Sequence, residues 1–331
     1  MASGIEPALS FVVLFRTGIC SVGDWDRDGA GGTTDRAVSY RLLRCAEQGR
    51  VDVFEGVVRH LHHDSGVCGT TYGRRLADVD AAVNGLLERR FPQTQPLLIH
   101  DWAASDCITS AEWARLVLPR FPCARFVASD VHLFLVEATA PGKSYILEAD
   151  GTPLEYVRPP FVLPLRVRFL RRPVNRLLAR RALGRAGEVT ELVKKCRWTG
   201  PEDGAVFRFP PWSLSQLSLV HPHAAAFRAA HPAFRIETHS VFEPLGEPAD
   251  AIRTMNILNR SYFSEARLAQ GIQAVFASLR EGGIWVAGRT DDEADPPVNA
   301  TSILEKREGR FAVVERMESG WDLEAMAMAV R

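Results

Sequence analysis

Two short apolar segments, each of which runs into an aspartate, constrain the fold of this chain most strongly. Residues 97–99 follow a proline and lead into Asp101, and residues 125–129 lead into Asp130. Short apolar runs bounded by proline and polar residues are typical of buried strands. The apolar positions around Trp113, between the two runs, have helical spacing. Strand, turn, helix and strand in this order predict the beginning of a parallel α/β sheet.

The C-terminal half repeats the alternation of strand-like and helix-like segments. The predicted strands here are residues 234–239, 249–256, 284–288, 311–315 and 323–330, and a helix is predicted from Leu268 to Leu279 by its 3–4 spacing of apolar residues. Together with the first two predicted strands, these five strands make a total of seven. We therefore predict an α/β fold with a doubly wound, mostly parallel seven-stranded sheet.

Two parts of the chain do not follow this pattern. Residues 1–95 are predicted to form a helical N-terminal region, which includes an exposed glycine-rich loop at 22–35. Residues 96–331 are predicted to form the α/β domain. That domain carries an inserted lobe at about residues 140–215, which begins with a β-hairpin with its turn at Asp150-Gly151.

Composition excludes several functional classes. Forty Lys and Arg residues balance forty Asp and Glu residues, so a generic nucleic-acid binder is not expected. The six cysteines form no C-x-x-C pair, which argues against a zinc or redox motif and favours a reducing compartment. No metal is expected at the histidines of residues 60–64, because their spacing matches no standard site. No apolar run is long enough to span a membrane. These features predict a cytoplasmic protein.

The candidate functional residues follow the predicted strands. In a doubly wound sheet, ligands bind outside the carboxyl ends of the strands. The small residues Ala103 and Ser105 suit a tight turn at such an end. Asp130, 29 residues after Asp101, is placed either to accept two hydrogen bonds from a ribose diol or to cap a following helix.

These segments resemble the class I S-adenosylmethionine-dependent methyltransferases. The turn at 101–107 lies where that family has an acidic residue followed by alternating glycines, although Ala103, Ser105 and Cys107 stand at the glycine positions. The downstream half is similar to the chemotaxis-receptor methyltransferases, through Asn256-Ile-Leu, Tyr262-Phe263 and the Gly-Gly strand lead at 282–283. The resemblance covers residues 96–136 and 220–330.

The resemblance implies S-adenosyl-L-methionine as the cofactor. The implied cofactor-binding residues are Asp101, Trp102, Ala103, Ser105, Asp130, Ser240, Val241 and Asn256. Methyl transfer to a nucleophile mainly requires alignment and the exclusion of water, so a strong general base is optional. The candidate catalytic residues are Tyr262, His239 and Asn259, and no metal is expected to take part.

The leading hypothesis is a biosynthetic methyltransferase that acts on a small molecule or a carrier-bound intermediate, and a homodimer is one option for its assembly. One alternative keeps the cofactor but transfers or cyclises its aminocarboxypropyl arm. Another is a non-catalytic binding protein on a degenerate methyltransferase scaffold.

The strongest charge asymmetry lies at residues 166–185, which hold eight arginines. No acidic residue occurs between Tyr156 and Glu188. Val174, Leu177 and neighbouring apolar residues give this segment an amphipathic pattern. Three interpretations remain open: an exposed helix paired with acids elsewhere, a cap that receives an acidic substrate or carrier protein, or a surface for nucleic acid or an anionic membrane.

Overall fold

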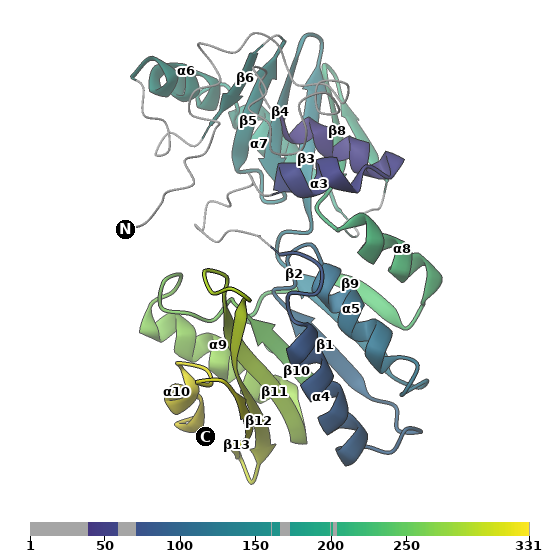
Figure 1. Cartoon of the computed structure of the whole chain (residues 1–331). Helices are drawn as coiled ribbons and strands as arrows, with labels where there is room; N and C mark the ends of the chain where they lie inside the picture. Colours follow the sequence, from purple (N-terminus) through teal and green to yellow (C-terminus); the bar gives the residue numbers. More distant parts are fainter. Residues whose placement is uncertain are drawn as a thin grey trace. The chain divides into compact units, whose positions relative to one another are not determined.

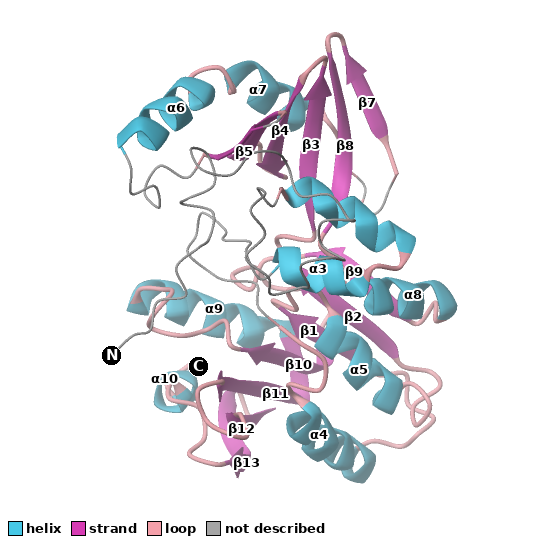
Figure 2. Ribbon diagram, turned by 45° about the horizontal axis from the view of Figure 1, so that its top comes forward, coloured by secondary structure: helices cyan, strands magenta, loops and turns pink. Residues whose placement is uncertain are grey.

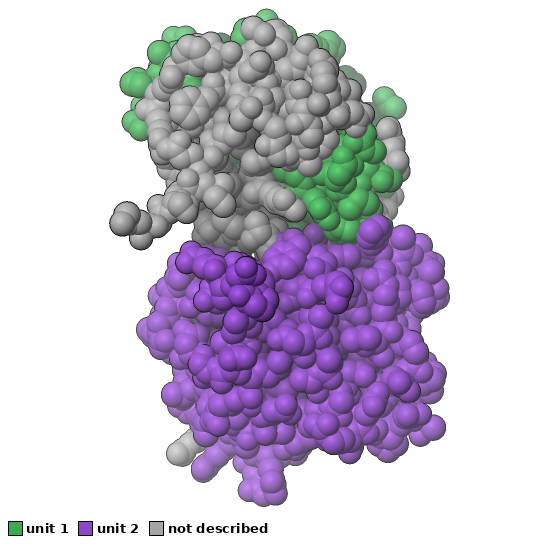
Figure 3. Space-filling view, in the orientation of Figure 1, with its two compact units in different colours: residues 1–70, 132–222 green, residues 71–131, 223–331 purple. Residues whose placement is uncertain are grey.

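The computed structural model describes residues 39–58, 71–159, 161–165, 173–198, 200 and 204–330. The chain divides into two compact units, which Figure 3 shows in different colours. Unit 1 comprises residues 1–70 and 132–222, and unit 2 comprises residues 71–131 and 223–331. The first unit is therefore made of two segments of chain, and the longer segment is inserted into the second unit.

Unit 2 is built on a seven-stranded sheet in the order β9-β2-β1-β10-β11-β12-β13. The strands are β1 (Leu98–Trp102), β2 (Arg125–Asp130), β9 (Phe234–Thr238), β10 (Ala249–Met255), β11 (Leu279–Asp291), β12 (Val298–Arg307) and β13 (Arg310–Met317). The pairings from β9 to β11 are parallel, and those of β12 with β11 and β13 are antiparallel. The parallel part has the strand order 3-2-1-4-5 of a doubly wound fold, and its direction of winding reverses between β1 and β10.

Helices cover both faces of this sheet (Figures 1 and 2). One side carries α4 (Ala77–Arg90) and α5 (Ile108–Val117), and the other carries α9 (Glu265–Ser278) and α10 (Glu324–Met328). A further helix, α8 (Pro222–Ala230), leads into β9. Leu268, Ile272 and Val275 of α9 are fully buried and belong to one core cluster with Ile252 and Trp285 of the sheet. Their spacing of three and four residues gives the apolar stripe by which α9 packs on the strands.

Unit 1 contains a six-stranded sheet in the order β6-β5-β4-β3-β8-β7, in which every pairing is antiparallel. Its strands are β3 (Phe134–Ala140), β4 (Lys143–Glu148), β5 (Pro153–Arg158), β6 (Phe161–Pro164), β7 (Val206–Phe209) and β8 (Trp212–Ser218). Its helical elements are the 3-10 helix η2 (Tyr40–Gln48), α3 (Val51–Val58), α6 (Pro173–Leu183) and α7 (Gly187–Lys195). Leu42, Val53 and Phe54 from η2 and α3 pack against Leu135 and Leu217 of the sheet.

Two buried glutamates tie the start of the described chain to the unit 1 sheet. Glu137 of β3 accepts a hydrogen bond from Nε of Arg44 at 2.9 Å and forms an ion pair with Arg41 at 2.6 Å. Glu155 of β5 accepts a hydrogen bond from the Ser39 hydroxyl at 2.5 Å. Burial raises the pKa of Glu155 to about 7. Polar contacts as well as apolar packing therefore hold η2 on this sheet.

The structure divides the chain differently from the boundaries predicted from sequence. Residues 39–58 belong to unit 1, whereas α4 packs with the sheet of unit 2, so residues 1–95 do not form one separate region. The inserted segment runs from 132 to 222 rather than from about 140 to 215. It lies between β2 and β9, the second and third strands of the parallel sheet along the chain.

Two predicted elements differ in type or place. The predicted final strand at 323–330 contains α10 instead, because Leu323 and Ala327, four residues apart, both face the core. The seventh strand of the sheet is β12, which is not among the predicted strands. The alternative in which Asp130 caps a following helix is also wrong, since the segment that contains Leu135 is the strand β3.

Several sequence features fall outside the described residues, including the loop at 22–35, the histidines of residues 60–64 and the arginines of 166–172. Across the described ranges, no group of three or more His, Cys, Asp or Glu side chains is arranged to hold a metal ion. None of the helices that the structure describes is long and apolar enough to cross a membrane.

Candidate functional site

The turn that follows β1 has an unusual backbone. Ala103, Ser105 and Cys107 all have positive φ angles, of 55°, 55° and 65°. Residues with a side chain rarely adopt this left-handed conformation, because Cβ approaches the next carbonyl oxygen at a cost of about 1–2 kcal/mol. Glycine avoids that cost, which explains why glycines would suit these alternating positions. The turn therefore has the backbone conformation that glycine favours, although alanine, serine and cysteine occupy its three left-handed positions.

Hydrogen bonds join this turn to the end of β2, and a further bond joins the end of β2 to the residue after β9. The backbone N–H of Ser105 donates to Oδ2 of Asp130 at 2.8 Å, and that of Ala104 donates to the carbonyl of Ser129 at 3.0 Å. The N–H of His239, just after β9, donates to the carbonyl of Asp130 at 3.3 Å. Asp130 therefore lies at the centre of the carboxyl ends of three neighbouring strands.

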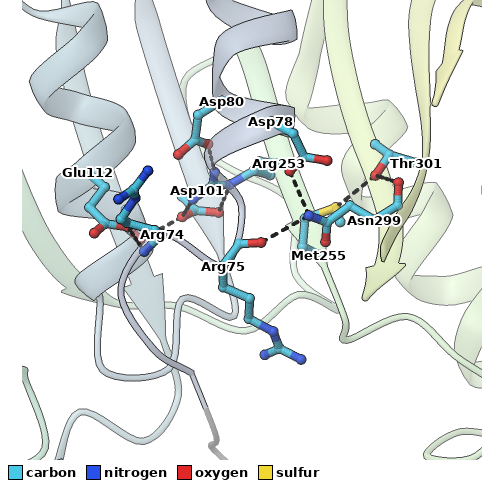
Figure 4. A network of polar contacts seen from close by, with 11 residues as sticks. Arg74, Arg75, Asp78, Asp80, Asp101, Glu112, Arg253, Met255, Asn299 and Thr301 are labelled. Atoms are coloured by element: carbon cyan, nitrogen blue, oxygen red, sulfur yellow. Dashed lines mark hydrogen bonds and ion pairs between the residues drawn. The ribbon is translucent and has the colours of Figure 1, made fainter. Parts of the chain in front are cut away.

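Asp101 takes part in a buried ionic network (Figure 4). Its Oδ1 accepts a hydrogen bond from Nε of Arg253 at 2.9 Å, and its Oδ2 accepts from Nη2 of Arg253 at 2.5 Å and from the Ser110 hydroxyl at 2.6 Å. Nη1 of Arg253 contacts Asp80 of α4, and the guanidinium lies 4.6 Å from the centre of the Trp113 ring. Asp101 and Arg253 are 3% and 0% exposed. Both carboxylate oxygens of Asp101 thus bind protein groups and hold β1 to β10 and α5.

Asp80 is the second carboxylate of this network. Burial raises the pKa of Asp80 to about 7, although the nearby charge of Arg253 acts in the opposite direction. A charged pair that is removed from water depends on good geometry and on further hydrogen bonds for its stability. The bidentate contact between Arg253 and Asp101 supplies such geometry.

Asn256 directly follows β10 and has a positive φ of 64°. Its Oδ1 accepts a hydrogen bond from the backbone N–H of Thr290 at 2.6 Å, and its Nδ2 donates to the Thr290 hydroxyl at 3.1 Å. The same hydroxyl donates to Oδ1 of Asn299 at 2.8 Å, and Nδ2 of Asn299 donates to the carbonyl of Arg75 at 2.9 Å. The side chain of Asn256 is therefore turned toward β11 and β12.

Residues 71–76, here called the strap, connect two sides of the carboxyl edge. The hydroxyl of Tyr72 donates to Asp292, in the turn between β11 and β12, at 3.0 Å. The backbone N–H of Arg74 donates to Glu112 of α5 at 2.8 Å. Figure 4 shows this loop passing between Glu112 and the strands that carry Asn299 and Thr301. The strap thus borders the same edge of the sheet as the turn after β1.

Trp102 and His239 form a ring contact beside Asp130, and His100 is a further buried aromatic side chain of β1. Trp102 is 1% exposed, and its ring centre lies 4.8 Å from that of His239. Nε1 of Trp102, Nε2 of His239 and Nδ1 of His100 are buried and have no hydrogen-bond partner among the described residues. Burial lowers the pKa of His239 and lowers that of His100 to about 4, so both imidazoles are neutral at pH 7. Buried polar atoms without a partner indicate a place where a ligand or water completes the hydrogen bonding.

The remaining predicted residues lie in two loops. Oγ of Ser240 accepts a hydrogen bond from the N–H of Phe242 at 3.3 Å, and Val241 is buried in the core beneath α9. Asn259 is buried, and its Oδ1 accepts from the N–H of Ser261 at 2.8 Å, so it holds the turn after β10. Tyr262 follows in that turn and is 37% exposed.

The structure therefore brings the predicted residues together as two groups. Trp102, Ala103, Ser105, Asp130 and His239 surround the ends of β1, β2 and β9, and Asn256, Asn259 and Tyr262 share the loop after β10. Asp101, Asp130 and Asn256 end three strands of one sheet edge, but the side chain of each has different partners.

Sequence reasoning missed Arg253, Thr290 and the strap. A signal for Arg253 was present, because a charged residue directly after Ala251 and Ile252 in a predicted buried strand requires a buried partner. Thr290 and Tyr72 carry no comparable signal, because threonine near a strand end and tyrosine in a loop are both common.

Comparison with known proteins assigns no family. No protein-family model and no curated protein matches the chain. Among solved structures, the chain is similar to CalS10, an amino pentose methyltransferase from Micromonospora echinaspora with bound S-adenosylmethionine, at 13% identity and a TM-score of 0.29. It is also similar to an O-methyltransferase family protein from Burkholderia thailandensis (12%, 0.28) and to an O-methyltransferase family 2 protein from Planctomyces limnophilus (14%, 0.26).

These matches cover 73%, 76% and 75% of this chain and 64%, 46% and 42% of the respective matched chains. The chain thus spans less than two thirds of the length of each. At these identities and scores, the description of the fold depends on the chain's own strand order and pairing.

Proposed function

We propose that the chain is an S-adenosyl-L-methionine-dependent methyltransferase, with the cofactor bound at the carboxyl edge of the unit 2 sheet. One observation carries the proposal. The left-handed turn at residues 103–107 is hydrogen bonded to Asp130 beside the point where the winding of the sheet reverses. Such a reversal is the usual ligand site of an open α/β sheet. The sequence resemblance to class I methyltransferases points to the same turn.

The residues at this edge fit an adenine nucleoside. A carboxylate has about four lone-pair sites, so Asp130 is able to bind Ser105 and still accept hydrogen bonds from a ribose diol. The buried indole N–H of Trp102 supplies a polar atom that lacks a protein partner among the described residues. Ser240 and Val241 follow His239 in the chain, and both are assigned to contact with the adenine ring of the cofactor. Ala103 and Ser105 are assigned to the methionine end.

The other predicted cofactor residues have positioning roles in this proposal. Asp101 fixes the start of the turn through Arg253 and Ser110, and Asn256 fixes the end of β10 through Thr290. Neither needs to touch the cofactor to affect its binding, because each sets the backbone that would contact it.

The cofactor, when bound, supplies a methyl group on a positively charged sulfur. The chain has to orient the acceptor and exclude water. The lowered pKa of His239 keeps its imidazole neutral, so it is able to accept a proton from an acceptor group at pH 7. Tyr262, which is 37% exposed, is a second candidate for substrate contact, whereas Asn259 is assigned to holding the turn that carries it.

The proposed acceptor is a small molecule or a carrier-bound intermediate in a biosynthetic reaction, and the proposed location is the cytoplasm. An alternative with the same cofactor is transfer or cyclisation of the aminocarboxypropyl arm. It is motivated by the side chains of Ala103, Ser105 and Cys107, which replace glycines in the turn that would face that arm. Product analysis separates the two, because S-adenosylhomocysteine follows methyl transfer and methylthioadenosine follows reaction of the arm.

Isothermal titration with S-adenosylmethionine and S-adenosylhomocysteine tests the cofactor assignment. Asp130→Asn keeps an acceptor for Ser105 but removes the charge, so affinity should fall by about 10- to 100-fold, as for one hydrogen bond to a charged group. Asp322→Asn, at an exposed site, should leave affinity unchanged. Absence of binding by the unmodified chain at millimolar concentration would remove the proposal. Equal affinity in both variants would remove the role of Asp130.

A further inference from the structure

Helix α6 of unit 1 exposes two of its larger apolar side chains, whereas its fully buried positions hold smaller residues. Val174 and Leu177 are 51% and 53% exposed, whereas Asn175, Ala179 and Ala182 face the protein. A surface helix ordinarily turns its apolar stripe toward the core of its own domain. In α6 the apolar residues of the outer face have no such contact, so this face is suited to a second surface.

The strand beside α6 adds a third apolar side chain. Helix α6 packs against β6, which is an edge strand of the unit 1 sheet. Phe161 in β6 is 53% exposed. Figure 1 shows α6 beside β6 at one end of this sheet. Phe161, Val174 and Leu177 therefore belong to one end of unit 1.

The same helix and the turn that follows it carry strong positive charge, with Arg180 and Arg181 in α6 and Arg185 in the turn. Arg180, Arg181 and Arg185 are exposed, and none of them forms an ion pair with another described residue. No acidic residue lies between Tyr156 and Glu188. Because the whole chain has a net charge of zero, this concentration of arginine is local rather than a result of composition. For these three arginines, the structure does not support the interpretation of a helix paired with acids elsewhere.

We propose that the outer face of α6, together with Phe161, binds the surface of a bilayer that contains anionic phospholipid. Arginine forms bidentate hydrogen bonds with phosphate, and basic residues near an anionic leaflet each add to the attraction. Exposed Val, Leu and Phe side chains gain free energy when they enter the boundary between headgroups and acyl chains. The helix would lie in the plane of the interface.

The combination of charge and apolar side chains favours a bilayer over other polyanions. Binding to nucleic-acid phosphates depends on charge and leaves exposed aliphatic groups without a role. An acidic protein would need a groove that fits α6, whereas the interface of a bilayer deforms around a helix. A single weak signal does not anchor a protein to a membrane, so the apolar and the basic residues should both be required. This inference does not depend on the proposed enzymatic function.

Vesicle flotation with the full chain tests the proposal. The probes are vesicles of phosphatidylcholine alone and of phosphatidylcholine with phosphatidylglycerol at about 7:3, a composition rich enough in charge to set a negative surface potential. The unmodified chain should float with the anionic vesicles at low salt and much less at high salt, because salt screens the attraction. Arg180→Gln with Arg181→Gln should weaken binding by about 30-fold, at about tenfold per 1.4 kcal/mol and about 1 kcal/mol per arginine.

The apolar contribution is tested separately. Val174→Ser with Leu177→Ser should weaken binding by about tenfold or more. Leu116→Ser, at a 45% exposed leucine of α5, and Arg310→Gln, at an exposed arginine of β13, are matched controls and should bind as the unmodified chain does. Thermal melts verify that every variant folds, as expected for exposed positions.

Three results would overturn the proposal. The first is equal flotation with neutral and anionic vesicles, or none with either. The second is a loss of binding that the controls share. The third is a loss in the arginine variant without a loss in the Val174 and Leu177 variant, which would identify a generic polyanion site. A single-stranded RNA that competes with vesicles in this last case would assign the face to nucleic acid instead.

Discussion

Replacement of Ala103 with glycine should stabilise the chain, which is the opposite of what an Ala→Gly change does in a helix. Ala103 has a φ of 55°, and its left-handed conformation costs about 1–2 kcal/mol because of its Cβ. Glycine removes this cost but has more conformational freedom to lose on folding, which amounts to about 0.5–1 kcal/mol. The expected net gain in the free energy of unfolding is therefore about 0.5–1 kcal/mol.

Thermal and urea unfolding of matched variants measure this gain. A change of 1 kcal/mol corresponds to about 2–4 °C in Tm for a domain of 150–250 residues. The matched control is Ala81→Gly at an exposed position inside α4, which should lower the free energy of unfolding by about 1 kcal/mol. Cys107→Gly should gain less than Ala103→Gly, because the Cys107 side chain is fully buried and its packing would be lost.

A decrease in Tm for Ala103→Gly, of the size seen for Ala81→Gly, would refute the reasoning. It would mean that the alanine side chain makes stabilising contacts larger than the backbone strain, or that the turn is not left-handed at this residue. A gain for Ala103→Gly beside a loss for Ala81→Gly would establish that the turn carries strain.

Three further predictions concern the same unit. Arg253→Met leaves two buried carboxylates without their partner, so it should lower the free energy of unfolding, measured in urea, by about 3–5 kcal/mol. Arg310→Met, at an exposed site, is the control and should have almost no effect. Similar unfolding midpoints for both variants would contradict this prediction. The pKa of His100 is lowered from 6.5 to about 4, so the native state binds fewer protons than the unfolded state between these values, and the stability present above pH 6.5 should be lost as the pH falls toward 4. At 1.36 kcal/mol per pH unit, this loss amounts to about 3 kcal/mol. His100→Phe should flatten the plot of unfolding free energy against pH in this range. Parallel plots for the variant and the unmodified chain would exclude His100 as the cause. Tyr72→Phe removes the hydrogen bond to Asp292, so trypsin should cleave the strap about three- to tenfold faster, and an unchanged rate would show that the bond does not restrain the strap.

The sequence predicted the parts of the sheet whose strands are short and apolar. Residues 97–102 and 125–130 are nearly all buried in β1 and β2, and strands buried on both faces read as continuous apolar runs. The strand β12 was missed because Asn299, Thr301 and Ser302 interrupt its apolar residues, and all three are buried through packing that the local pattern does not reveal. The residues 323–330 suit a short strand or a helix equally, and only the core position of Ala327 decides between them.

For the candidate site, the sequence predicted the position of the turn and of the strand ends better than the contacts of their side chains. The turn at 103–107 and its neighbour Asp130 were recognisable because tight turns and strand ends have local signatures. The partners of Asp101 were not, because Arg253 and Asp80 are distant in the chain and meet only when α4 packs beside β10. Sequence spacing predicts which strand end a residue occupies, but the direction of its side chain depends on packing.

The path of the chain through unit 1 has an evolutionary consequence. Phe134 of β3 pairs with Ser218 of β8, so the inserted segment enters and leaves its own sheet on adjacent strands. The flanking strands β2 and β9 pair directly with each other, so the larger sheet keeps its continuity with or without the insertion. A segment whose ends meet in this way is suited to exchange as a cassette between related proteins. Helices η2 and α3, which come from a separate N-terminal segment, pack on the sheet of that cassette. Residues 39–58 and 132–222 would therefore have to be inherited together.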